Sequence, residues 1–131
     1  MSPSRASRHP RVFDNLNPNW NDQERWRNAL YVQSVEVTAN HILQTRGYIS
    51  LNEVLKLLGF EKDWWGDLVG WVRGSEESSG YIEFGVWAHG FAEGRDWVRG
   101  KLAFKALYFN VDQAEDPLPV RIRKLKAEGK L

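Results

Sequence analysis

The stretch YISLNEVLKLLGF, residues 48–60, carries the strongest local fold signal in the chain. Ser50 is followed three residues later by Glu53, the spacing of a capping box in which each side chain bonds the other residue's backbone N–H. Gly59 stands where a helix commonly ends in a left-handed residue. Between them, four apolar residues recur at helical spacing: Leu51, Val54, Leu55 and Leu58. The stretch therefore predicts a short helix that begins at Ser50 and ends at Gly59.

The residues before this helix allow two interpretations. In the preferred one, residues 29–33 form a short β-strand because ALYVQ is rich in β-formers, and Ser34 then caps a helix that ends at Arg46, before Gly47. The apolar face of that helix would contain Val35, Ala39, Ile42 and Leu43. The alternative is one continuous helix over residues 21–46, which its β-branched and aromatic residues disfavour.

The second half of the chain is predicted to be β structure. Glycines at four positions interrupt any helical pattern and favour turns: Gly66, Gly70, Gly74 and Gly80. Residues 81–87 (YIEFGVW) and 104–111 (FKALYFNV) alternate apolar and polar side chains, which predicts two antiparallel strands packed against the helices. The connection at residues 88–100 has room for one helical turn near Ala92. The predicted fold class is α+β, with two or three short helices followed by a small antiparallel sheet and extended N- and C-terminal arms.

Composition and charge divide the chain into three parts. With 131 residues and 42% hydrophobic content, it has the size of one domain with its own core. Residues 1–20 are predicted to be an extended basic N-terminal arm, residues 21–117 a single α+β domain, and residues 118–131 a basic C-terminal tail. Residues 14–117 contain 10 basic and 16 acidic residues, a net charge of −6, although the whole chain has a net charge of +1. Basic ends on an acidic body suit contacts with phosphate or with an acidic neighbour.

The same composition excludes several classes of protein. The chain has no cysteine, so disulfide frameworks, thiol nucleophiles and cysteine zinc sites are excluded. No apolar run approaches the roughly 20 residues that span a bilayer, and no signal-peptide pattern is present, so we expect neither membrane insertion nor secretion by that route.

No catalytic or metal-binding pattern stands out, and we predict no catalytic residues, no metal ligands and no cofactor. The three histidines have no second ligand at metal spacing: His9, His41 and His89. The carboxylates have no spacing that selects an acid–base pair, and the serines lack the strand–turn–helix context of a nucleophile. We therefore expect that the protein is not an enzyme and has no small-molecule substrate.

Tryptophan is the most informative residue type, with seven in the chain. Neighbouring residues on a strand face opposite sides, so Trp64 and Trp65 cannot both point inward, and one of them should be exposed. Trp71, between Gly70 and Val72, is predicted to lie in the core. Exposed tryptophan marks protein contacts more often than sugar or base stacking. The predicted protein interface consists of the two tryptophans and two apolar residues of the N-terminal arm: Phe13, Leu16, Trp64 and Trp65.

The basic residues at the two ends are candidates for contacts with phosphate or with an acidic partner. They are Arg5, Arg8, Arg11, Arg121, Arg123, Lys124 and Lys126. Contacts of this kind would bind nucleic acid without sequence specificity, or would fasten the ends to an acidic protein surface.

Several segments together resemble a family of small uncharacterised proteins encoded by bacteriophages and prophages. They are RGYISLNEVLKLLGF at 46–60, GDLVGW at 66–71, YIEFG at 81–85 and LYFNVD at 107–112. The resemblance covers about two-thirds of the chain and brings no assigned activity or catalytic residues. It implies a phage or mobile element as the source, with the protein in the bacterial host cytoplasm, the virion or both.

Two functional hypotheses follow. The first is a non-enzymatic phage or mobile-element protein that acts through protein–protein assembly, as a virion structural or accessory component whose partners are other protein subunits or further copies of itself. The second is a nucleic-acid-binding or host-takeover factor that uses the basic arms. A carbohydrate binder with exposed tryptophans is a third, weaker hypothesis.

Overall fold

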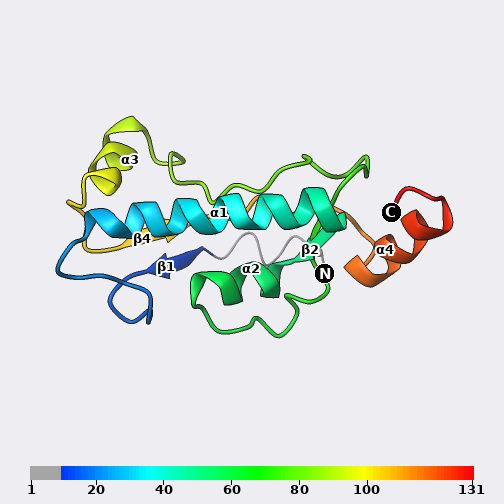
Figure 1. The fold of residues 1–131 in the computed structure, drawn as a ribbon, viewed down its shortest axis with the longest axis horizontal. Helices are drawn as coiled ribbons and strands as arrows, with labels where there is room; N and C mark the ends of the chain where they lie inside the picture. The colour runs from blue at the N-terminus through cyan, green and yellow to red at the C-terminus, as the bar shows by residue number, and fades with distance from the viewer. Residues whose placement is uncertain (1–9) are drawn as a thin grey trace.

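A computed structural model describes residues 10–131 and shows an α+β fold, as predicted (Figure 1). Its elements in chain order are β1 (Arg11–Phe13), α1 (Trp26–Arg46), β2 (Tyr48–Ser50), α2 (Leu51–Leu58), β3 (Gly70–Val72), α3 (Phe91–Val98), β4 (Lys105–Leu107) and α4 (Leu118–Ala127). The strands form two antiparallel pairs, β1 with β4 and β2 with β3. Helix α1 is the longest element; α2, α3 and β2 pack against it, whereas α4 lies beyond its C-terminal end and packs against β3.

The predicted break at residues 29–33 is wrong, because α1 is one continuous helix of 21 residues. Its inward face is made by alanine, valine and leucine residues at helical spacing: Ala29, Val32, Val35, Ala39 and Leu43. Burial of this whole face outweighs the β preference of its residues. Ser34 does not cap the helix but donates to the Tyr31 carbonyl at 2.6 Å, and Gly47 ends the helix with a φ of 98°, as predicted.

The helix at Ser50 is confirmed in detail. The Ser50 side chain accepts from the Glu53 N–H, and the Glu53 carboxylate accepts from the Ser50 N–H. Gly59 ends the helix at a φ of 90°. The strand before it, β2, pairs with β3 at Ile49 opposite Trp71, and a Cβ at Gly70 would overlap the Ile49 carbonyl. A glycine is therefore needed where these strands come closest.

The predicted pairing of residues 81–87 with residues 104–111 is wrong. Residues 105–107 pair instead with β1, and one backbone hydrogen bond, from Tyr108 N–H to the Phe84 carbonyl, joins the two segments. Residues 81–86 form no strand but lie along α1, whose side chains bond their backbone. Asn40 bonds both the N–H and the carbonyl of Ile82, and Glu36 accepts from the Phe84 N–H at 3.0 Å. Helix side chains thus take the place of a neighbouring strand.

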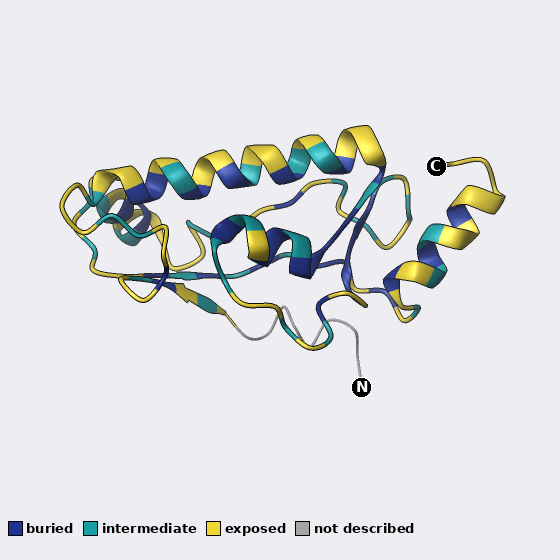
Figure 2. Ribbon diagram, turned by 60° about the horizontal axis from the view of Figure 1, so that its bottom comes forward, coloured by how far each residue is buried: buried dark blue, intermediate teal, exposed yellow. Residues whose placement is uncertain are grey.

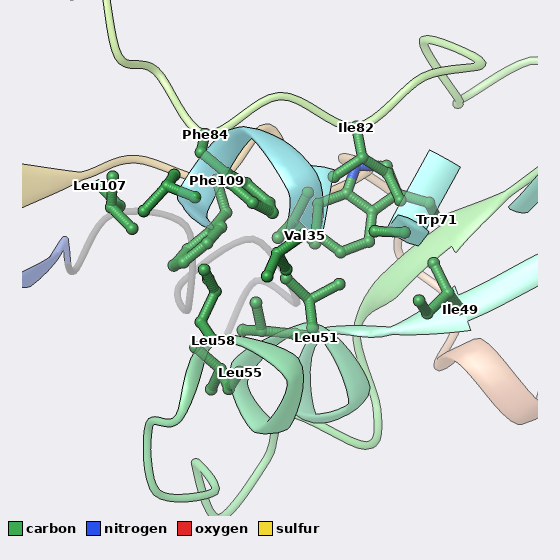
Figure 3. Packing of buried hydrophobic residues seen from close by; sticks show 14 of the residues in the cluster. Val35, Ile49, Leu51, Leu55, Leu58, Trp71, Ile82, Phe84, Leu107 and Phe109 are labelled. Carbon is green, nitrogen blue, oxygen red and sulfur yellow. The ribbon is translucent and has the colours of Figure 1, made fainter. Parts of the chain in front are cut away.

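The core lies between α1, α2 and the central segments, where the labelled side chains converge (Figure 3). Trp71 is fully buried, as predicted, and its indole N–H donates to the Asn110 carbonyl at 2.9 Å. The alternating apolar residues of the two mispredicted strands are buried as expected even though they form no sheet together: Ile82, Phe84, Leu107, Phe109 and Val111. Alternation therefore predicted burial correctly and the pairing partner incorrectly.

Within the described residues, both ends of the chain differ from the extended arms that the sequence predicts. Residues 11–13 form β1 and place Phe13 in the core, so this part of the N-terminal arm belongs to the body. Residues 118–127 of the predicted tail form α4, the helix nearest the C-terminus, which Figure 2 shows with both buried and exposed residues. Its Leu118 and Leu125 cluster with buried Val72. Apolar residues at helical spacing explain this helix, and Pro119 lies in its first turn, where a missing N–H costs nothing.

Candidate functional site

A groove of about 510 Å³ lies between α1, residues 83–88 and α3. From α1 it is lined by Ala29, Leu30, Val32, Gln33 and Glu36; from the two other segments it is lined by Glu83, Gly85, Val86, Trp87, Ala88, Trp97 and Val98. The predicted single turn near Ala92 is in fact the eight-residue helix α3, and this longer helix forms one wall of the groove.

Helix α3 is held in place from the inside. Trp97 is 1% exposed and packs on Trp20 and Phe13, with ring centroids 6.2 and 6.3 Å away. Just after the helix, Gly100 has a φ of 74°, and a Cβ there would overlap the backbone of Trp26 at the start of α1. The close approach of the two backbones fixes the wall of the groove on the body.

Large exposed apolar side chains lie in the lining of the groove and beside it. We call five of them the exposed apolar cluster: Trp26, Leu30, Trp87, Phe91 and Val98. Each is between 46% and 71% exposed. The rings of Trp87 and Phe91 stack with centroids 5.7 Å apart, and Trp87 lies directly over Gly94, where a Cβ would overlap its ring. An apolar surface of this kind beside a groove is typical of a binding site.

Two carboxylates contribute to the lining, Glu36 and Glu83. Burial raises the pKa of Glu36 above its usual range, and the negative charge of Glu83 adds to this, although the Phe84 N–H opposes it. One Glu36 oxygen thus accepts from the backbone, and two carboxyl groups share a mostly apolar lining. Such a site favours a ligand that supplies positive charge.

The residues predicted to form a protein interface differ in how exposed they are. Phe13 is fully buried, whereas Leu16 is 88% exposed. Trp64 is 82% exposed and stacks on Trp65 with ring centroids 5.1 Å apart, while Trp65 packs partly against the core. The expectation that one of the two tryptophans is exposed is therefore confirmed.

The predicted basic contact residues are mostly engaged within the chain. Arg11 pairs with Asp63 at 2.6 Å, and Lys124 pairs with Asp116 at 2.7 Å. Arg121 is buried and pairs with buried Asp112 at 2.9 Å. Arg123 is exposed, and the Lys126 ammonium lies 5.9 Å from the ring centroid of Tyr48. Arg5 and Arg8 lie outside the described residues.

Within residues 10–131, no three side chains of His, Asp or Glu come together in a way that could hold a metal ion. His41 is exposed, His89 lies 2.9 Å from the Tyr108 hydroxyl, and His9 is outside this range. In the same part of the chain, none of the helices has the length and apolar character required to cross a membrane.

Sequence reasoning missed the groove because its residues come from three separate segments. One usable signal was present, the spacing of Glu36 and Asn40, which places two polar side chains on one face of a helix that is otherwise apolar there. Both bond the segment that carries Glu83 and Trp87.

One comparison with known proteins gives a match. No curated protein and no solved structure matches the chain. The model of a family of unknown function, DUF6353, matches residues 4–116, which is most of the chain and includes every residue that lines the groove. The chain therefore belongs to this family of unknown function.

Proposed function

We propose that the protein is non-enzymatic and acts through protein–protein assembly. The observation that carries this proposal is the exposed apolar cluster around the groove. Its five side chains are each about half or more exposed, and two of them, Phe91 and Val98, are on helix α3, which buried Trp97 anchors to the core. Apolar surface of this extent usually becomes covered by another protein chain.

A second exposed aromatic site supports assembly rather than a single contact. Trp64 lies in the segment between α2 and β3, which Figure 1 shows on the other side of α1 from α3. Contact sites on two different faces allow each subunit to join two neighbours, as in rings and filaments.

The setting we propose is a bacteriophage or another mobile element, with the protein as a structural or accessory component of the particle. This part of the proposal depends on the resemblance of residues 46–60, 66–71, 81–85 and 107–112 to phage proteins. It places the protein in the bacterial host cytoplasm, in the virion or in both.

Light scattering after size exclusion tests the assembly. The chain has a mass of 15.2 kDa, and we expect a larger mass that rises with concentration. Exchange of Trp87 and Phe91 for serine should return the mass to that of a monomer. Val37→Ser is the matched control, because Val37 is exposed on α1 but does not line the groove. A monomer at every concentration that is also absent from purified phage particles would contradict the proposal.

The nucleic-acid hypothesis receives less support from the described residues. Arg121 is buried in an ion pair, and Arg11 and Lys124 each pair with an aspartate of the same chain. Phosphate binding through the ends predicts an affinity that falls steeply with salt, with a log–log slope of about −0.9 per contact on duplex DNA. Absence of DNA and RNA binding at low salt would end this hypothesis.

A further inference from the structure

The lining of the groove restricts the chemistry of its occupant. The lining residues, all of them described, include Glu36 and Glu83 but no lysine or arginine. A purely apolar occupant would cover these carboxylates without compensating their charge, which is costly. A segment with a basic side chain would pair with them, and its apolar stem would lie against the rest of the lining.

Trp87 favours arginine over lysine as that basic residue. Its ring is half exposed and is fixed in orientation by Phe91 and by the backbone of α3 at Gly94. A planar guanidinium can stack on such a ring and bond a carboxylate with two parallel hydrogen bonds, whereas an ammonium group does neither as well. The groove thus combines the two features that recognise arginine.

We infer that the groove of one copy binds residues 1–9 of a second copy, with Arg5 or Arg8 placed between Trp87 and the two carboxylates. This inference rests on the proposed function and names the partner for one of its surfaces. The segment MSPSRASRH contains two arginines and no acidic residue. The two arginines are separated by two small residues, Ala6 and Ser7, which fit a narrow space. Its charge is complementary to residues 14–117, which have a net charge of −6.

The described residues next to this segment favour a second copy over the same chain. Arg11 is fixed by its ion pair to Asp63, and β1 is fixed by its pairing with β4. Figure 1 shows β1 and α2 on one side of α1 and α3 on the other. Residues 1–9 in extended form span about 30 Å, which is enough to reach the groove of an adjacent molecule.

A charge-reversal experiment on the full chain tests this inference. One variant carries Arg5→Glu and Arg8→Glu, and the other carries Glu83→Arg at an exposed position of the groove. Measured by sedimentation velocity at low salt, each variant alone should self-associate at least about tenfold more weakly than the wild type. An equimolar mixture should recover the association, since the acidic segment of the first then meets the basic groove of the second.

Three results would overturn the inference. The first is an unchanged association in both variants while Trp87→Ser still dissociates the protein, in which case the proposed function stands and only the partner segment is wrong. The second is a mixture no more associated than its components. The third is a wild-type chain that is a monomer throughout, which removes the second copy and leaves the proposed function to the particle assay. Lys130→Glu is the matched control for a lost exposed cation at the other end of the chain.

Discussion

Two aromatic regions lie close together in this molecule, one closed and one open. In the closed region, Phe13 is fully buried among four rings whose centroids lie 5.5 to 6.3 Å away: Trp20, Tyr31, Phe60 and Trp97. In the open region, the Trp87 ring stacks on Phe91 at 5.7 Å, and both are at least half exposed. Helix α3 contributes to both, because Trp97 faces inward and Phe91 outward. The closed region stabilises the helix, and the open region is thereby presented to a partner.

The largest expected effect comes from opening the closed region. Phe13→Ala should lower the free energy of unfolding by about 3–5 kcal/mol, because it removes a buried ring and leaves a cavity among four aromatic neighbours. Urea denaturation followed by tryptophan fluorescence measures this loss, and Trp20 and Trp97 report on the cavity directly.

Leu16→Ala is the matched control, because it removes an apolar side chain three residues away that is 88% exposed. We expect a change within about 0.5 kcal/mol. Equal losses in the two variants would mean that residues 10–20 do not pack on the body as the structure shows.

Two ion pairs of the C-terminal helix, one buried and one exposed, show the same contrast between a closed and an open region. The expected loss of stability is somewhat smaller than for Phe13→Ala. Arg121 and Asp112 are both buried, and burial raises the pKa of Asp112 even though the Arg121 guanidinium opposes the shift. Arg121→Met keeps an apolar stem but leaves a buried carboxylate unpaired, so we expect a loss of about 3 kcal/mol in urea denaturation. Lys124→Met breaks the exposed pair with Asp116 on the same helix and should produce no measurable change. A loss of equal size in both variants would contradict the assignment of Arg121 to the interior.

The helix at residues 51–58 could be predicted from the sequence because its signals are local. The capping box and Gly59 act within a few residues of the helix they delimit. The end of helix α1 at Gly47 was predicted correctly, but its start was not, since its β-forming residues are overruled by burial against distant segments. The pairing of β4 was missed for the same reason, because its partner β1 lies more than 90 residues earlier in the chain.

The candidate site shows the same limit. That Trp64 or Trp65 would be exposed followed from the geometry of neighbouring residues. Phe13 and Leu16, in contrast, look alike in the sequence, because both are apolar residues in the predicted N-terminal arm. Only the folded chain shows that Phe13 is buried and Leu16 is exposed. The groove depends on residues 29–36, 83–88 and 97–98 meeting in space, which no local pattern encodes.

A double-mutant cycle can show whether α3 positions Trp87. A Cβ at Gly94 would overlap the Trp87 ring, so Gly94→Ala should displace that ring from Phe91 and lower stability by about 1 kcal/mol. In a Trp87→Ala background the overlap is gone, and the same substitution should instead raise stability by about 0.5–1 kcal/mol through helix propensity. The measurement is urea denaturation of the four proteins. If Gly94→Ala changes stability in the same direction in both backgrounds, the Trp87 ring is not held in place by α3.

The smallest expected effect concerns the charge in the groove. The pKa of Glu36 is raised in the folded state, chiefly by burial, so at neutral pH its charged form opposes folding. Glu36→Gln keeps an oxygen that accepts from the Phe84 N–H and removes the charge. It should be more stable than the wild type at pH 7, by less than about 1 kcal/mol because the side chain is only partly buried.

As the pH falls through the raised pKa of Glu36, the folded wild type takes up a proton before the unfolded chain does, and its disadvantage relative to Glu36→Gln should shrink. Thermal unfolding of both proteins between pH 7 and pH 4 measures this difference, and Glu83→Gln is the control at an exposed position of the same groove. A difference that grows with acidification would mean that the folded state favours the charged carboxylate. An arginine of a second copy bound in the groove would produce that result, so both proteins are compared at a concentration at which the wild type is a monomer.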